Sequence, residues 1–386
     1  MKIGSIPYEF SKEDIFIYVL LCPAIFLYVL FDRFPLIYAV PFVYVVYRIS
    51  TDSNFSQQIR NIRESDYFRL ILSVIVLGLI SLCFHDLHFD DKVWIRDVVI
   101  IVASLIPFIV ANTFTDKHVK AIFVTQAVSY FLWIDYSSLF TFSSSVKRLR
   151  WSTEYDLGLF FGLFVLYFFL TKSYQWFLVS LIIALLISKR VVFIGFGFCG
   201  VLYLFNLIIS QKRSNRTDQI ILFSSFILLG IISLNLVDII SFFVAKAGKN
   251  PVMTNKFLNG RADVFNFSTF KILHANALQF FLGHGSGQLD ASITLFRPVP
   301  WAQYSAKPTN PHNDFLKILF DYGVLGFLTF GYFLSKIYSS NKMGVYLLGF
   351  TLVLFLVDNS FLHVYYNLIA YIILSVKQIE SNKDAQ

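Results

Sequence analysis

The residues best suited to chemistry are a histidine and a set of cations at the ends of apolar segments. His312 stands beside Asn313, where the polar stretch "KPTNPHND" gives way to an apolar helix. An imidazole can accept a proton near neutral pH, as the activation of a hydroxyl nucleophile requires. Asn313 or Asp314 would be enough to cap the helix. His312 is therefore a candidate general base, with a satisfied residue of the cap region as the alternative interpretation.

Five basic residues are predicted to lie on the same outer side of the membrane as His312, and they are Lys189, Arg190, Arg261, Arg148 and Arg150. A guanidinium group can bind a phosphate through two parallel hydrogen bonds, and it stays charged at any relevant pH. Two or three of them could neutralise a departing pyrophosphate without a metal. With His312, the set fits group transfer from a lipid pyrophosphate to a sugar hydroxyl. For the short "SKR" turn at 188–190, contact with lipid phosphates remains the alternative to binding an anionic substrate.

Other motifs are weak or absent. The "GHGSG" stretch at 283–287 permits a tight turn, but it follows no predicted strand, so it is a weak sign of a phosphate site. His284 is more readily a turn residue than a ligand. The chain contains no HExxH, CxxC, DxD or GxSxG motif, and we expect no metal site, no cofactor and no serine nucleophile. Its cysteines lie in or at the end of apolar segments and are expected to be small core residues.

The elements that must position these residues are apolar helices. Of the 386 residues, 56% are hydrophobic and 15% are charged, and the mean hydropathy is +0.65. A soluble domain would carry about a quarter charged residues. The chain is therefore expected to be an all-α polytopic membrane protein. About twelve spans are predicted, near 14–31, 34–47, 68–84, 93–111, 119–134, 156–171, 174–188, 190–209, 219–243, 314–337, 343–357 and 360–376, with 174–188 and 190–209 as one bent hairpin in the alternative.

The distribution of Lys and Arg sets the predicted orientation. Most basic connections fall on one side if both termini are cytoplasmic. The N-terminal segment is expected to be a retained signal anchor. The net charge of +8 then reflects cytoplasmic loops and anionic lipid rather than nucleic acid.

Three parts follow from this topology. Residues 1–243 would hold nine N-terminal spans, 244–312 would form one large periplasmic loop, and 313–386 would hold the last three spans and a cytoplasmic tail. Loops of that length are usually functional or disordered. The aromatic and apolar content of 244–312 indicates a folded loop, with short helices on the membrane surface and an amphipathic helix from about 261 to 278, capped by Asn259 or Gly260.

The order of these features is similar to that of a known family. Many spans, one late outer loop, "GR" at 260–261, "GHGSG" in the middle, "HN" at 312–313 and a downstream "YGVLGF" together resemble the O-antigen ligase and polymerase superfamily of bacterial envelopes. The resemblance is strongest over residues 180–335. The N-terminal third is similar only in its number of spans.

The resemblance implies a GT-C-like membrane fold in the bacterial inner membrane and metal-independent, inverting glycosyl transfer on the periplasmic face. Arg190 and Arg261, with Lys189 beside them, would hold the pyrophosphate of an undecaprenyl-linked donor. His312 would orient or deprotonate the acceptor hydroxyl, and Asn313 would contribute to substrate binding. The family's usual "SR" is "SKR" in this chain. The expected partners are the lipid-linked glycan donor and acceptor and membrane lipid, with a polysaccharide chain-length regulator as a further candidate.

The favoured activity is polymerisation of lipid-linked repeat units, because the short chain and its Phe-, Ile- and Asn-rich composition are similar to antigen polymerases. Ligation of glycan to the lipid A core is the first alternative. A lipid-linked oligosaccharide transporter is the second, although no internal repeat of the kind common in transporters is present. A scaffold without chemistry would predict that His312→Ala and Arg261→Ala leave surface polysaccharide unchanged.

Overall fold

The computed structural model is built almost entirely from helices. It describes residues 10–31, 36–51, 60, 62–82, 91–110, 113–133, 141–143, 148–150, 158–187, 189–208, 214–249, 252–258, 261–296, 312–358 and 360–376. Within these residues the β structure consists of one antiparallel pair, β1 (Thr141–Ser143) with β2 (Arg148–Arg150), and an isolated bridge between Phe114 and Val376. The helical fold class expected from the sequence is thus confirmed.

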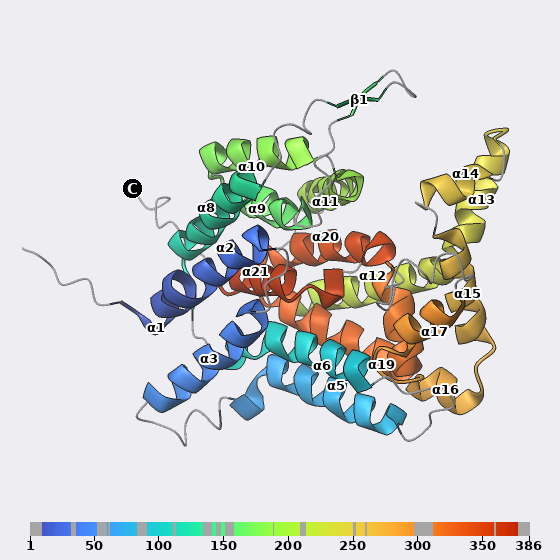
Figure 1. Cartoon of the computed structure of the whole chain (residues 1–386), viewed down its shortest axis with the longest axis horizontal. Coiled ribbons are helices and arrows are strands. Elements are labelled where there is room, and N and C mark those ends of the chain that lie inside the picture. Colours follow the sequence, from blue (N-terminus) through green and yellow to red (C-terminus); the bar gives the residue numbers. More distant parts are fainter. Residues whose placement is uncertain are drawn as a thin grey trace, which may run out of the picture. The chain divides into compact units, whose positions relative to one another are not determined.

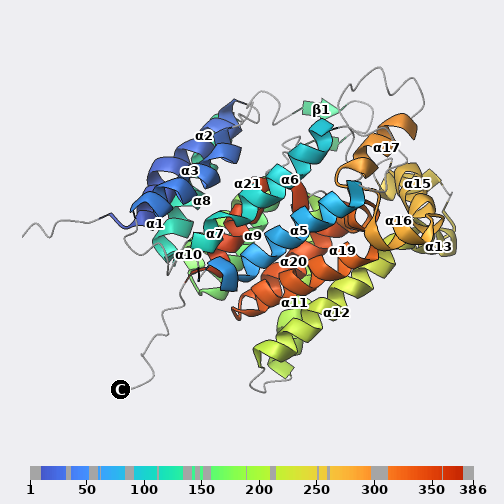
Figure 2. The ribbon, with the colours of Figure 1, turned by 90° about the horizontal axis from the view of Figure 1, so that it is seen from below.

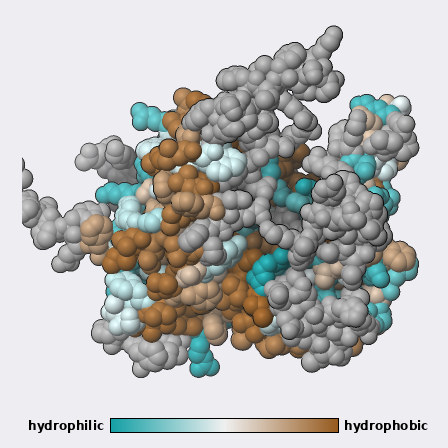
Figure 3. Space-filling view, viewed as in Figure 1, coloured by the Kyte–Doolittle hydropathy of each residue, from teal (hydrophilic) through white to brown (hydrophobic). Residues whose placement is uncertain are grey.

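Among the described residues, three helices are long and apolar enough to cross a membrane, and they cover Lys12–Leu30, Asn215–Leu234 and Asp314–Ser339. Shorter apolar helices cover Leu36–Thr51, Gly158–Leu170, Tyr174–Ile187, Val191–Leu204, Gly344–Val357 and Val364–Leu374. Hydrophobic side chains cover much of the described surface in view (Figure 3). The protein is therefore a membrane protein, while the number of twelve spans stays a prediction.

The chain divides into two compact units, each made from separate segments of the sequence. The first combines residues 1–62, 106–188 and 368–386, and the second combines 63–105 and 189–367. The three-part division expected from the sequence follows topology along the chain and stays a prediction.

The first unit is made of packed apolar helices (Figure 1), and aromatic side chains fill part of its core. Its helices are α1 (Lys12–Asp14), the π-helix (Ile15–Leu21), α2 (Cys22–Leu30), α3 (Leu36–Thr51), α7 (Pro107–Val110), α8 (Asp116–Trp133), α9 (Gly158–Leu170) and α10 (Tyr174–Ile187). Ser11 and Asp14 form a capping box at the start of α1. Asp14 also lies 2.8 Å from Nε2 of the buried His118, which ties the first helices to α8. Phe123 packs edge to face against Phe164 and Phe168.

The second unit is organised around α19 (Asp314–Ser339). The other elements of this unit are α5 (Asp66–Leu82), α6 (Asp91–Leu105), α11 (Arg190–Ile208), α12 (Asn215–Leu234), α13 (Leu236–Lys246), α14 (Val252–Phe257), α15 (Ala262–Leu273), α16 (Ala277–Leu282), α17 (Gln288–Phe296), α20 (Gly344–Val357) and the 3-10 turn η2 (Ser360–Leu362). α21 (Val364–Leu374) begins here, and its residues from Leu368 belong to the first unit. Both α12 and α20 pack along α19, and α11 packs along α20 (Figure 2).

Small residues allow these helices to approach closely. A Cβ at Gly230 of α12 would meet the ring of Phe327 on α19, and one at Gly331 would meet the ring of Phe226. The later residue of α12 contacts the earlier residue of α19, and the earlier residue of α12 contacts the later one, so α12 and α19 are antiparallel. At one end of α19, Lys336 Nζ lies 2.8 Å from Asp66 Oδ1 at the start of α5. His312 lies at the other end of α19, as the predicted topology requires.

Several boundaries differ from those expected. The predicted span 219–243 is divided at Asn235, where α12 ends and α13 begins. The helix predicted from 261 to 278 ends at Leu273, and its N-cap residue is Arg261, without a side-chain cap bond. Asn259 and Gly260 lie outside the described residues. The segments 174–188 and 190–209 are separate helices, α10 and α11.

The glycine turn before α17 is confirmed, with φ of 82°, 107° and 78° at Gly283, Gly285 and Gly287. α19 is itself broken at Gly323, where φ is 65° and ψ is −172°. The two features meet, because a Cβ at Gly283 would collide with the backbone of Asp321 and Gly323. Only a residue without a side chain fits this close backbone approach.

Gly283→Ala is expected to destabilise the protein more than Gly248→Ala. Both glycines have positive φ, but a Cβ at Gly248 would meet nothing within 4 Å. The control therefore carries only the backbone cost of about 1–2 kcal/mol, while Gly283→Ala adds a steric cost of about 1–3 kcal/mol. The measurement is the apparent melting temperature of detergent-purified protein. Equal losses for the two variants would contradict the close approach of the turn to α19.

Candidate active site

His312 precedes α19 in an unusual backbone conformation. Its φ of 53° lies in the left-handed region, which is uncommon for a residue other than glycine. The side chain is 33% exposed. Strained conformations of this kind persist where the surroundings enforce them, and they are frequent at functional sites. The backbone conformation of His312 therefore motivates a functional role for this residue.

Asn313 fixes the chain directly after the histidine. Its side-chain oxygen accepts hydrogen bonds from Leu316 N at 3.0 Å and Ser233 Oγ at 2.8 Å, and its Nδ2 donates to Leu356 O at 3.0 Å. Asn313 is completely buried. The predicted capping by Asn313 is confirmed, and the same side chain joins α19 to α12 and α20. These contacts are all made within the protein, and binding of substrate by Asn313 stays a prediction.

Asp314 does not cap α19 but holds the segment that follows α20. Its Oδ2 accepts a hydrogen bond from Phe361 N at 2.8 Å, and Ser360 Oγ lies 3.4 Å away. This carboxylate therefore fixes the start of η2 beside the start of α19. Asp358 lies between the end of α20 and this fixed turn.

Three of the predicted site residues contact the end of α20, at its last residue Val357 and at the C-cap residue Asp358. Lys189 Nζ lies 2.9 Å from Asp358 Oδ2, and His312 Nδ1 lies 3.5 Å from Asp358 Oδ1. Arg261 Nη1 donates to Val357 O at 3.3 Å. The three residues come from the start of α11, the start of α15 and the start of α19. Separate segments therefore bring an ammonium, a guanidinium and an imidazole to one helix end.

The sequence did not single out Asp358 as a site residue. A carboxylate beside Nδ1 of an imidazole favours the tautomer with hydrogen on Nδ1 and leaves Nε2 to accept a proton. The carbonyl end of a helix also attracts cations. Asp358 opens the short polar stretch "DNS", and nothing local in the sequence indicates which cations its carboxylate meets.

Arg190 is the first residue of α11, but its side chain lies outside the described residues. The same is true of the side chains of Arg148 and Arg150 in β2. The predicted role of Arg190 is therefore unchanged. In the described part of the site, its neighbour Lys189 supplies the cation that reaches Asp358.

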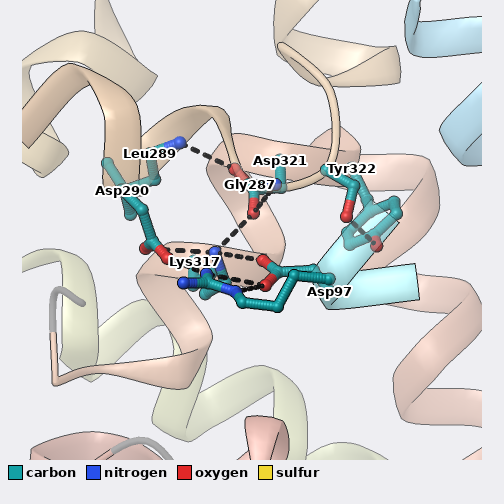
Figure 4. Close-up of polar contacts among 9 residues, drawn as sticks. Asp97, Gly287, Leu289, Asp290, Lys317, Asp321 and Tyr322 are labelled. Atoms are coloured by element: carbon teal, nitrogen blue, oxygen red, sulfur yellow. Dashed lines mark hydrogen bonds and ion pairs between the residues drawn. The ribbon is translucent and has the colours of Figure 1, made fainter. Parts of the chain in front are cut away.

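A second cluster of charges lies further along α19 (Figure 4). Lys317 Nζ lies 2.9 Å from Asp97 Oδ2, 3.1 Å from Asp290 Oδ1 and 2.9 Å from Asp321 Oδ2. Arg96 Nη2 lies 2.6 Å from Asp290 Oδ2 and 2.7 Å from Asp97 Oδ1. Lys317 and the three carboxylates are at most 2% exposed. The cluster joins α6, α17 and α19, and it was not predicted from the sequence.

Asp290, on α17 outside the predicted spans, shows the electrostatic balance in this cluster. Complete burial raises the pKa of its carboxyl, and the cations of Lys317 and Arg96 oppose that rise. Within the described residues, no three His, Cys, Asp or Glu side chains are arranged to hold a metal ion. The ammonium of Lys317 occupies the position among the three aspartates.

Asp321 also holds the glycine turn. Its Oδ2 accepts a hydrogen bond from Gly287 N at 2.9 Å, and its Oδ1 accepts one from Leu289 N at 2.9 Å. His284 N donates to Phe320 O at 2.8 Å, and the imidazole stacks on the Phe320 ring. A protein carboxylate thus takes up backbone donors of the kind that bind phosphate elsewhere. His284 is a turn residue, as expected.

Residues 175–331 match the family model described as O-antigen ligase. Over these residues the chain is similar to the O-antigen ligase family. This match confirms the resemblance to the O-antigen ligase and polymerase superfamily. The matched segment includes Lys189, Arg261 and His312, whereas Asp358 follows it. No curated protein and no solved structure gives a significant match to the chain.

Lys317→Met is expected to destabilise the protein strongly, because it removes the ammonium that contacts all three buried carboxylates and leaves Arg96 to contact two of them. Removing one partner of a buried ion pair typically costs about 3–5 kcal/mol. Lys336→Met is the matched control on the same helix, where the side chain is 33% exposed and pairs with Asp66, and it should cost at most about 1 kcal/mol. Apparent melting temperatures in detergent would compare them. Similar losses would contradict a structural role for the cluster.

Proposed function

We propose that this protein polymerises undecaprenyl-pyrophosphate-linked repeat units into O-antigen or a related surface polysaccharide, on the periplasmic face of the inner membrane. The O-antigen ligase domain supports the general activity, that of a membrane glycosyltransferase of the ligase and polymerase type. The observation that carries the site is the gathering of Lys189, Arg261 and His312 around the end of α20. Such a set can bind a diphosphate and accept a proton from a hydroxyl.

In this proposal the acceptor hydroxyl attacks the anomeric carbon of the donor sugar from the face opposite the pyrophosphate. A bond forms between that carbon and the acceptor oxygen, and the bond to the pyrophosphate oxygen breaks, so the configuration inverts. Nε2 of His312 takes the hydroxyl proton, while Asp358 stabilises the imidazolium. Lys189 and Arg261, with Arg190 beside them, neutralise the charge that develops on the leaving group.

Asp358 gives the cations a partner when no donor is bound. Its carboxylate already lies 2.9 Å from Lys189 Nζ, so a diphosphate would exchange one anionic partner for another. Charged groups buried without partners are costly. Asp358 therefore keeps the site assembled between turnovers, and it remains beside His312 to orient the imidazole.

The positions of the site residues and of the basic residues at opposite ends of α19 agree with a periplasmic site. Lys189, Arg261 and His312 lie at one end of α19, whereas the basic residues Lys336 and Lys342 follow at the other end. The positive-inside rule assigns the latter end to the cytoplasm. Both termini are proposed to be cytoplasmic on the same grounds.

His312→Ala is expected to lower glycan transfer by at least about 100-fold, because loss of a general base typically costs a factor of about 10²–10⁴. His274→Ala is the control, since His274 is an exposed histidine at the end of α15. Purified protein with a lipid-linked glycan would supply the rates, and electrophoresis would show the polysaccharide of complemented cells. Normal transfer by folded His312→Ala protein would refute the proposed role of the histidine.

The family description favours ligation of glycan to the lipid A core as the second candidate function. Deletion of the protein separates the two reactions, because polymerisation precedes ligation. Loss of a polymerase should leave lipid A core that carries a single repeat unit. Loss of a ligase should leave bare core and accumulate glycan on the lipid carrier. Electrophoresis of lipopolysaccharide from the deletion strain therefore decides the acceptor, and the second pattern would overturn the polymerase assignment.

A further inference from the structure

α15 carries an exposed stripe of side chains whose character changes along the helix. Asp263 and Asn266 are exposed in its first half, and Phe270 and Leu273 are 57% and 58% exposed in its second half. These positions are spaced by three or four residues and share one face. A face that begins polar and ends apolar is expected where a helix passes from water into an apolar medium.

The apolar surface continues on the next helix. On α16, Leu278 is 46% exposed and Phe281 is 49% exposed, with Phe280 at 36%. We name the five side chains the outer apolar patch, and its members are Phe270, Leu273, Leu278, Phe280 and Phe281. A cluster of large exposed apolar side chains on consecutive helices indicates a surface that meets another phase or partner.

The outer apolar patch adjoins surfaces that face lipid. α16 packs against both α5 and α19, and Figures 1 and 2 show it beside the ends of these helices. α19 is long and apolar enough to span the membrane. Exposed apolar side chains recur at helical spacing on these two helices, among them Leu72, Val76 and Leu79 on α5 and Leu325, Leu328 and Tyr332 on α19.

The burial of α19 gives a second indication of where lipid begins. Every residue from Asp314 to Gly323 is buried, and exposed side chains begin at Leu325. A helix of 26 residues is about 39 Å long, whereas the hydrocarbon core is about 30 Å thick. A straight, upright helix of this length would therefore extend beyond the hydrocarbon, and the break at Gly323 lets the two halves of α19 meet different surroundings. Gly323 packs against the backbone of Phe281, so the patch lies level with the point where exposure begins.

We propose that the second half of α15 together with α16 seats in the boundary between headgroups and acyl chains of the outer leaflet. Interfacial helices bury an apolar face and keep basic residues at the phosphates. The exposed Lys271 follows Phe270 directly and lies 5.8 Å from the Phe267 ring, so its ammonium can reach an anionic headgroup along an apolar stem.

This anchor would orient the arginine of the site. Arg261 is the N-cap residue of α15, so the helix that carries the guanidinium at one end would be held in the membrane at the other. The donor's lipid tail lies in the same membrane, and the anchor would set the depth at which the guanidinium meets the diphosphate. That consequence rests on the proposed function, whereas the membrane contact itself does not.

The test places nitroxide labels on full-length protein in vesicles of phosphatidylethanolamine and phosphatidylglycerol. Single cysteines are introduced by Phe270→Cys, Leu273→Cys, Leu278→Cys and, as a reserve position on α16, Phe281→Cys, in a background in which Cys83 is serine and the buried Cys22 and Cys199 are retained. Asn266→Cys is the matched control on the same face of α15. Power saturation compares collisions with oxygen, which enriches in lipid, and with a water-soluble nickel chelate.

The expected result is that oxygen collisions exceed nickel collisions severalfold at the patch positions, with a depth of about 5–10 Å below the phosphates, and that the order reverses at Asn266→Cys. Equal nickel access at the patch and at the control would show a water-exposed surface and overturn the proposal. Shielding of the patch labels from both reagents would show that protein, not lipid, covers the patch, and this would also overturn the proposal. The labels report depth without donor or acceptor, so absent glycan transfer with labels in lipid would refute only the proposed function.

Discussion

The ammonium of Lys317 lies among three buried carboxylates that come from segments far apart in the sequence. Asp97 belongs to α6, Asp290 to α17 and Asp321 to α19 itself. A buried charge of this kind is tolerated only with close partners of opposite sign. The second unit can therefore form only when α6 and α17 reach the same level of α19. Because Asp321 also accepts two backbone hydrogen bonds, the glycine turn is fixed by the same requirement.

The candidate site depends on this arrangement, since His312 lies just before the start of the helix that carries Lys317. Asn313 and Asp314 hold the start of α19 against α12, α20 and η2, so the backbone on either side of the site has little freedom. His312 keeps a left-handed conformation that an unsupported chain would rarely adopt. Lys189 and Arg261 reach Asp358 and Val357 with long side chains from more distant helices. A rigid imidazole and adaptable cations suit a diphosphate that must enter and leave.

Much of this organisation could be predicted from the sequence. Apolar runs indicated the helices, the junction at His312 indicated the imidazole, and Arg261 and Lys189 were found from their charge at outer helix ends. The buried cluster was missed, although its signal was present as Arg96, Asp97, Lys317 and Asp321 inside predicted spans. Ionisable residues in such positions need partners, and the spacing of Lys317 and Asp321 by four residues places them on one face.

What could not be predicted is which distant groups pair. Asp358 and Asp290 lie in segments whose local sequence is compatible with a simple helix end and a surface helix. Asp358 pairs with Lys189, which is 169 residues away, and Asp290 pairs with Lys317, which is 27 residues away. Local propensity carries no information on contacts of that separation. The break at Asn235 and the early end of α15 at Leu273 were missed for a related reason, because hydrophobic periodicity continues across both.

The kink at Gly323 divides α19 between two environments. Before it, the helix is enclosed by α15, α16 and α17 and can bury Lys317 and Asp321 among protein groups. After it, exposed Leu325 and Leu328 suit lipid, where an unpaired charge would be costly. A lipid-linked diphosphate has the same division, with an apolar tail and a doubly charged head. In the proposed function, the cations at the end of α19 that begins with Asn313 and Asp314 would meet the charged head, and the apolar half of the helix would face the tail.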